Sequence, residues 1–114
     1  MPTSEIDKAT FEELKQMSGA DFIGELVDTF LEDGPKLIAE LKAALKAGDA
    51  EAFRRAAHSL KSNAATFGAM HLSQLAKDLE MIGKENRLAE TGGRIADFES
   101  ALASASAELR GLRP

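Results

Sequence analysis

Apolar residues recur at intervals of three and four positions along almost the whole chain. This is the period of one buried face of an α-helix. The clearest stripe consists of Phe22, Ile23, Leu26, Val27, Phe30 and Leu31. We find no run in which apolar and polar residues alternate, and no Asn-Gly hairpin turn. The sequence therefore predicts an all-α fold.

Capping and turn residues divide this pattern into helices. The predicted helices cover residues 11–17, 20–33, 35–47, 50–67, 69–83 and a last segment from Ile95 to Leu109. The sequence "TFEE", starting at Thr10, is a capping box and predicts the beginning of the first helix. Gly34 and Pro35 predict a break between the second helix and the third, because proline suits a first helical turn.

Two further connections are equally short. Gly48 followed by Asp49 predicts a C-terminal glycine and then an N-cap, and Gly68 is expected to close the helix over 50–67. Long amphipathic helices with short loops pack against their neighbours in antiparallel fashion. We expect an up-down antiparallel four-helix bundle with one or two short accessory helices at the N-terminus, forming a single domain over residues 1–114.

Composition excludes several functional classes. The net charge of −5 argues against a general nucleic-acid-binding protein, which needs a basic face. The absence of cysteine excludes a disulfide framework and a thiolate metal site. No run approaches the roughly 18 apolar residues of a membrane span, and the N-terminus lacks the apolar run of a secretory signal. We expect a cytoplasmic protein that meets protein partners rather than membranes.

The helix over 50–67 has two distinct faces. At 100° per residue, one face gathers the predicted core residues Phe53, Ala57, Leu60, Ala64 and Phe67. The opposite face carries Arg54, Arg55, His58, Lys61, Ser62 and Ala65. His58 is therefore expected to be exposed. Ala65 is small, so that a partner could approach the histidine closely.

A hairpin around Gly68 brings one more residue to this face. His58 lies ten positions before Gly68 and Glu80 lies twelve after it, so the two are expected at the same height. Glu80 could then accept a hydrogen bond from one ring nitrogen and leave the other nucleophilic. Lys61, at i+3, could neutralise a phosphoryl group there. Spacing alone leaves the alternative open, since most lone histidines on helices are merely solvated.

The segment "AAHSLKSNAATFGAMHLSQLAKDLE", from Ala56 to Glu80, resembles the signature of histidine-containing phosphotransfer (HPt) domains. That family shows an Ala-His-x-Leu-Lys-Gly core, a Gly-Ala pair about ten residues on, and a Leu-Glu or similar pair at the end of the next helix. The preceding "FLEDGPKLIAELKAALKAGDAEAFRR" is also similar to the family. The resemblance implies a phosphorelay carrier, not a self-contained enzyme, which takes a phosphoryl group from a receiver aspartate and passes it on.

The resemblance assigns roles by position. His58 would be phosphorylated, Lys61 would stabilise the phosphoryl oxygens, Glu80 would contact the imidazole and Gly68 would be the turn glycine. The chain departs from the family pattern at Ser62, where glycine is usual. A serine hydroxyl could donate to a phosphoryl oxygen, so we expect function to be retained.

The resemblance also implies the partners. These would be receiver domains of response regulators or a hybrid sensor kinase, with Mg²⁺ bound by the receiver and no cofactor on this chain. Arg54 and Arg55 are either plain solvated charges or residues that attract an acidic receiver pocket. Ile23 and Leu26 are candidates for an apolar docking patch, unless this helix is simply well buried. We expect a monomer.

The sequence leaves other functions open. It has two histidines but no paired Glu-x-x-His motifs, so a di-iron bundle site is not expected, and His71 is expected to be a solvated or capping residue. An adaptor bundle that binds a receiver without phosphorylation stays open, and only a phosphotransfer protein would require His58. The sequence also leaves open a free-standing protein or one domain of a hybrid kinase.

Overall fold

The computed structural model describes residues 5–112, and every regular element in this range is helical. The elements are α1 (Lys8–Ser18), α2 (Ala20–Ala47), α3 (Ala50–Thr66), α4 (Met70–Lys84), the short 3₁₀ turn η1 (Leu88–Glu90) and α5 (Arg94–Leu112). The predicted all-α class is confirmed. Within the described residues, no helix combines the length and the apolar character that a membrane crossing requires.

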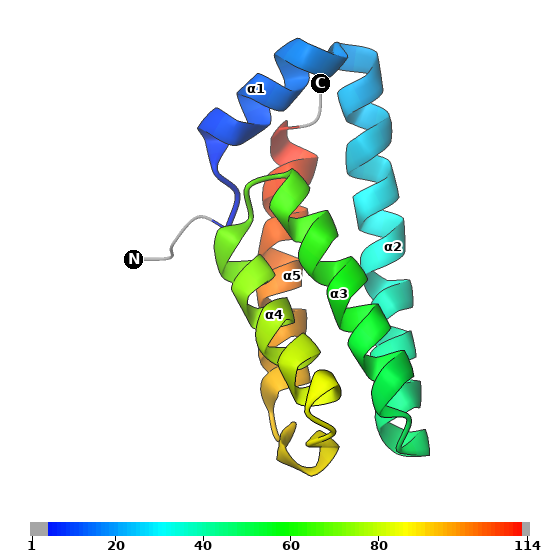
Figure 1. Cartoon of the computed structure of the whole chain (residues 1–114). Helices are drawn as coiled ribbons and strands as arrows, with labels where there is room; N and C mark the ends of the chain where they lie inside the picture. Colours follow the sequence, from blue (N-terminus) through cyan, green and yellow to red (C-terminus); the bar gives the residue numbers. More distant parts are fainter. Residues whose placement is uncertain (1–4, 113–114) are drawn as a thin grey trace.

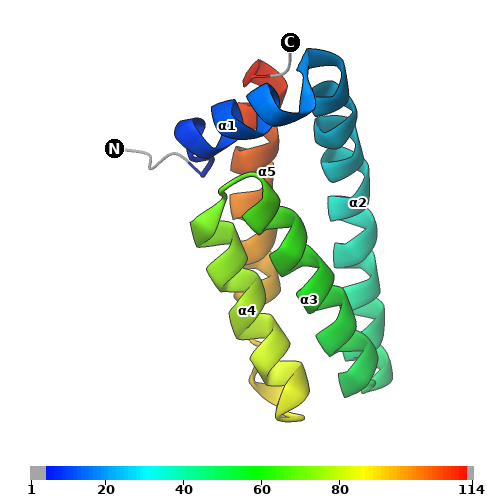
Figure 2. The ribbon, with the colours of Figure 1, turned by 45° about the horizontal axis from the view of Figure 1, so that its top comes forward.

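Helices α2, α3, α4 and α5 lie side by side along the long axis of the molecule, whose principal extents are 42 × 30 × 18 Å (Figure 1). The short helix α1 lies across one end, next to the connection between α3 and α4, and Figure 2 shows the same placement from a second direction. The most extensive contact between two helices is that of α3 with α4. The site described below lies on this pair.

The core is built from the stripes that the helical period predicts. The five core residues predicted for the helix over 50–67 are all buried, four of them within α3 and Phe67 at its C-cap. One of them, Phe67, packs edge-on against Phe30 with ring centroids 5.4 Å apart and stacks on Phe11 at 6.4 Å. These contacts join α1, α2 and the end of α3. Burial of one face of α3 forces the opposite face, with His58, toward solvent.

The predicted break at Gly34 and Pro35 is wrong, because α2 continues through both residues. Gly34 is buried, and a Cβ there would meet Leu102 of α5 at 3.0 Å, so glycine allows the two helices to approach closely. Pro35 is exposed and removes one backbone donor from the helix. Buried residues on both sides of it, such as Phe30 and Ile38, hold α2 together through tertiary packing.

The helix starts are set by aspartate caps. Helix α1 begins at Lys8, and its N-cap Asp7 accepts hydrogen bonds from the Ala9 amide and the Thr10 hydroxyl, each at 3.0 Å. The capping box predicted at Thr10 is therefore wrong, since Thr10 lies inside the helix and donates to Asp7. At the α2–α3 connection the prediction is confirmed, because Gly48 has φ = 70° and Asp49 accepts from the Ala52 amide.

Candidate functional site

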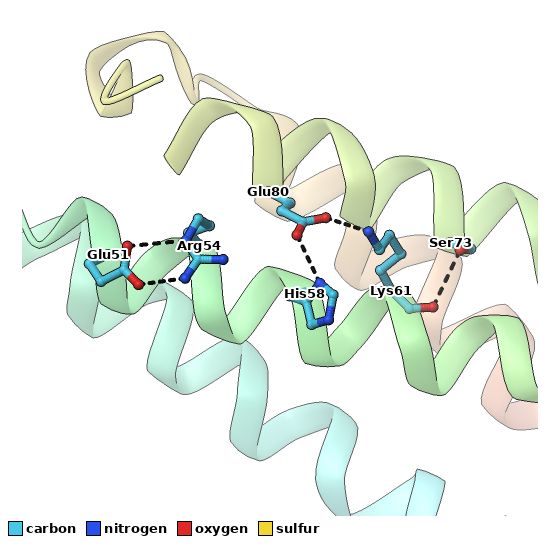
Figure 3. A network of polar contacts seen from close by, with 6 residues as sticks. All are labelled: Glu51, Arg54, His58, Lys61, Ser73 and Glu80. Carbon is cyan, nitrogen blue, oxygen red and sulfur yellow. Dashed lines mark hydrogen bonds and ion pairs between the residues drawn. The ribbon is translucent and has the colours of Figure 1, made fainter. Parts of the chain in front are cut away.

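His58 lies midway along α3 on its solvent-facing side, with 55% of its side chain exposed. Its Nδ1 is 2.8 Å from Oε2 of Glu80 on α4 (Figure 3). The other ring nitrogen, Nε2, points away from this carboxylate. The contact expected from the spacing around Gly68 is thus present, and it joins the two helices of the hairpin.

Lys61 binds the same carboxylate from the next turn of α3. Its Nζ donates to Oε1 of Glu80 at 2.6 Å. The Glu80 side chain is only 14% exposed, whereas that of Lys61 is 30% exposed. One carboxylate therefore uses one oxygen for the imidazole and the other for the ammonium group.

The charge state of Glu80 determines the tautomer of His58. Partial burial raises the pKa of Glu80, but the hydrogen bonds from Lys61 and His58 outweigh burial, and the net pKa is lowered. Glu80 is therefore ionised at neutral pH and can only accept hydrogen bonds. The proton of a neutral His58 ring must then reside on Nδ1, which leaves the lone pair on Nε2.

Ser62 and Ala65 lie on the same exposed side of α3, one and two turns after His58. Because both side chains are small, they place no bulky group beside the imidazole. Ser62 also accepts, through its main-chain oxygen, a hydrogen bond from the Thr66 hydroxyl at 3.1 Å. Gly68 follows with φ = 69°, and a Cβ there would meet Cβ of Thr10 at 2.8 Å, so a larger residue would disturb the turn.

The two arginines differ in their surroundings. Arg54 lies one turn before His58 and makes a two-pronged ion pair with Glu51 within α3 (Figure 3). Arg55 is exposed and borders a shallow hollow with Glu40 and Ser59. Arg54 is thus already partnered, and Arg55 is exposed beside an acidic side chain.

The prediction that Ile23 belongs to an exposed docking patch is wrong. Ile23 is fully buried, because it lies on the α2 face that also buries Val27 and Phe30. Leu26 is partly buried and lines a groove between α2 and α3, together with Thr29, Phe30, Asp33, Asn63, Thr66 and Phe67. The large hydrophobic side chain that α2 exposes is instead Phe22, at 50%.

The signal for Phe22 was present in the sequence. Phe22, Leu26 and Thr29 follow one another at intervals of four and three, so they share one edge of α2. Thr29 is polar, and a polar residue indicates that this edge of α2 faces away from the core. No sequence pattern indicates Ser73, which is buried and donates to the main-chain oxygen of Lys61 at 3.3 Å.

Within residues 5–112, no group of three or more histidine, aspartate or glutamate side chains is arranged to hold a metal ion. The contacts of His58 and Lys61 with Glu80 present an exposed nucleophilic nitrogen, an anion behind it and a nearby cation. Such an arrangement suits the capture of a phosphoryl group, whose transfer depends mainly on positioning and on charge stabilisation.

Comparison with known proteins identifies the family. The sequence pattern of the Hpt domain matches residues 25–110, most of the chain. The chain belongs to the Hpt domain family. The phosphorelay protein LuxU of Vibrio harveyi is 32% identical over 92 residues, covering 81% of each chain.

A solved Hpt structure supports the same assignment. The crystal structure of histidine-containing phosphotransfer protein B (HptB) from Pseudomonas aeruginosa PAO1 is similar with a TM-score of 0.90 and 29% identity, over 98% of this chain and 96% of that one. The function of the chain is thus histidine phosphotransfer in a multistep phosphorelay, as a phosphotransfer intermediate.

Proposed function

We propose that His58 carries the phosphoryl group, and that it is attached at Nε2. The observation that carries this proposal is the 2.8 Å contact of Nδ1 with Glu80 on a ring that is 55% exposed. The contact reserves Nδ1 for the proton and turns the lone pair of Nε2 toward an incoming partner. The second histidine, His71, lies on α4 and faces Glu5 instead.

The transfer step moves one phosphoryl group between a receiver aspartate and the His58 ring. The Nε2 lone pair attacks the phosphorus of an aspartyl phosphate on a receiver domain. An N–P bond forms, the P–O bond breaks, and the electron pair leaves with the receiver carboxylate. Because the ring keeps its Nδ1 proton, it gains positive charge, and the Glu80 carboxylate stabilises that charge. Donation to a second receiver is the reverse step.

Lys61 has a place in the same step. A phosphoryl group on Nε2 adds negative charge one turn of helix away from the Lys61 ammonium group. The flexible four-carbon stem of lysine allows it to leave Oε1 of Glu80 and pair with a phosphoryl oxygen. Ser62 could add a hydroxyl donor, and Ala65 keeps the approach open.

We propose that the partners are receiver domains of response regulators, or a hybrid sensor kinase that contains one. A receiver would supply the phosphorylated aspartate and its Mg²⁺. The groove lined by Leu26, with the exposed Phe22 on the same edge of α2, offers apolar contact beside the α3 face that carries His58. Arg55 adds positive charge for an acidic receiver pocket.

The proposal extends to the whole chain as one domain over residues 1–114, acting as a monomer. In it, α2 to α5 form an up-down antiparallel four-helix bundle that carries the site on its surface. The short α2–α3 and α3–α4 connections and the extensive contact of α3 with α4 support this arrangement. The bundle would have no nucleotide site of its own and would depend on its partners for phosphoryl groups.

The test is transfer from a phosphorylated receiver onto three proteins: the natural chain, His58→Gln and His71→Gln. His71→Gln is the matched control, because His71 is also exposed and its Nδ1 lies 3.1 Å from the Glu5 carboxylate. We expect acid-labile, base-stable label on the natural chain and on His71→Gln, and none on His58→Gln. Label that persists on His58→Gln would contradict the assignment.

A further inference from the structure

Three small or polar residues on one face of helix α4 contact α3, the helix that carries His58. Ser73 donates to the main-chain oxygen of Lys61, and Glu80 binds His58 and Lys61. The third position is Gly83, which is buried three residues after Glu80. Spacings of seven and three place all three positions on the same side of α4.

At Gly83 the two helices lie too close for even a methyl group to fit between their backbones. A Cβ on Gly83 would meet the main-chain nitrogen of Arg54 at 2.9 Å, and the Ala50 oxygen and Arg54 Cα at 3.0 Å. All three atoms belong to the backbone of α3. No side chain could therefore rotate away to make room, and an added methyl group would have to push the helices apart.

Local conformational preference does not explain a glycine at this position. Gly83 lies within α4, and glycine weakens a helix relative to alanine. The chain holds a useful comparison in Gly111 of α5, where an added Cβ would meet nothing within 4 Å. Gly83 is needed for the close approach of α4 to α3, whereas Gly111 is not.

We infer that Gly83 is a positioning residue for phosphotransfer, because it sets the separation between α3 and α4 that lets one Glu80 carboxylate reach both His58 and Lys61. This inference rests on the proposed role of His58. Gly83 lies within one turn of Glu80, and Arg54, which it touches, lies one turn before His58. The close contact and the site therefore share the same stretch of the helix pair.

The size of the effect follows from the contact distances. Ordinary van der Waals separation requires the new methyl group to back off by about 0.5 Å from the Arg54 nitrogen. An equal displacement of Glu80 would stretch its 2.8 Å contact with His58 beyond the usual limit of about 3.2 Å for an N–H···O hydrogen bond. Gly83→Ala should therefore loosen the site without removing any group from it.

The experiment compares Gly83→Ala with the matched control Gly111→Ala. The first readout is the ¹⁵N chemical shifts of the His58 ring in the unphosphorylated protein, which report the tautomer. The second is a ¹³C titration of the Glu80 carboxyl group, and the third is the rate of transfer from a phosphorylated receiver. For Gly83→Ala we expect a mixed tautomer, a higher Glu80 pKa and a rate roughly 10- to 100-fold lower. Gly111→Ala should match the natural chain.

A double variant separates positioning from a general loss of structure. If Gly83 acts through Glu80, Gly83→Ala should slow transfer little further in a Glu80→Gln background. Rate losses that multiply in the double variant would overturn the inference, and so would natural tautomer and titration behaviour in Gly83→Ala. Both NMR readouts use unphosphorylated protein, so they decide the role of Gly83 even if His58 proves not to accept phosphate.

Glu80→Asp provides a second variant in case Gly83→Ala does not fold. Aspartate is one methylene shorter, so it mimics a wider separation without adding a clash. We expect the same mixed tautomer and slower transfer. A natural tautomer and rate in Glu80→Asp would show that the helix separation does not limit the site, which would also overturn the inference.

Discussion

At the scale of single residues, the site depends on how one carboxylate divides its two oxygens. Oε2 of Glu80 accepts a hydrogen bond from Nδ1 of His58, and Oε1 accepts one from the Lys61 ammonium group. A charged acceptor strengthens both hydrogen bonds, and partial burial limits screening by solvent. The same residue therefore fixes the tautomer before transfer and stabilises the charge that the ring gains during it.

Glu80→Gln tests this division directly. A glutamine amide places an NH₂ group where the carboxylate has one of its two oxygens, so one of the two donors faces another donor, and the amide brings no negative charge. We expect the rate of transfer onto His58 to fall by roughly 10- to 100-fold while the protein stays folded. Glu85→Gln is the control, because Glu85 is exposed and pairs with Arg87 instead. Equal rates for the two variants would refute the role of Glu80.

The lowered pKa of Glu80 predicts how stability depends on pH. A carboxyl group whose folded pKa lies below its ordinary value of 4.5 stabilises the fold above that pH, and the contribution is lost as pH falls through the folded pKa. The free energy of unfolding should therefore drop more steeply below about pH 4.5 in the natural chain than in Glu80→Gln. Urea denaturation at several pH values measures this, and parallel curves would contradict it.

At the scale of helices, local physics predicted α3 and its face correctly, and it also placed Glu80 opposite His58. Both follow from the helical period and from a short turn at Gly68. The same kind of reasoning failed at Gly34 and Pro35, because the contact of Gly34 with Leu102 joins residues far apart in the sequence. The role of Gly83 could not be predicted for the same reason, since only the close approach of α3 to α4 explains a glycine at this position.

Pro35→Ala tests the account of α2. The proline is exposed within a continuous helix, so alanine should restore a backbone hydrogen bond to the helix. Greater freedom of the unfolded chain offsets part of that gain. We expect the free energy of unfolding to rise by about 1–2 kcal/mol in chemical denaturation. Lys36→Ala, at the next exposed position, should change it by less than about 0.5 kcal/mol. A loss of stability in Pro35→Ala would contradict this account of the helix.

At the scale of the whole molecule, one end of the fold is closed by contacts among distant segments. Phe67 joins α3 to Phe30 of α2 and Phe11 of α1. The main-chain amides of Glu5 and Ile6 donate to the carboxylate of Glu108 on α5, at 3.2 and 2.7 Å. These contacts hold α1 over the connection between α3 and α4, and so they support the hairpin that carries the site.

Phe67→Ala should therefore destabilise the entire fold. Removing a buried aromatic ring that packs on two helices typically costs about 3–5 kcal/mol, and we expect a loss of that size in the free energy of unfolding. Phe22→Ala is the control, because Phe22 is half exposed, and it should cost less than about 1 kcal/mol. Thermal and urea denaturation measure both variants. Similar losses for the two would show that the ring cluster does not hold this end together.

The position of the phosphorus on the phosphorylated protein tests the central claim most directly. We would phosphorylate ¹⁵N-labelled protein from a receiver and observe ³¹P–¹⁵N coupling within the histidine rings by NMR. The account predicts that phosphorus is bonded to Nε2 of His58, with a proton retained on Nδ1 facing Glu80. Phosphorus on Nδ1 of His58, or on His71, would contradict it.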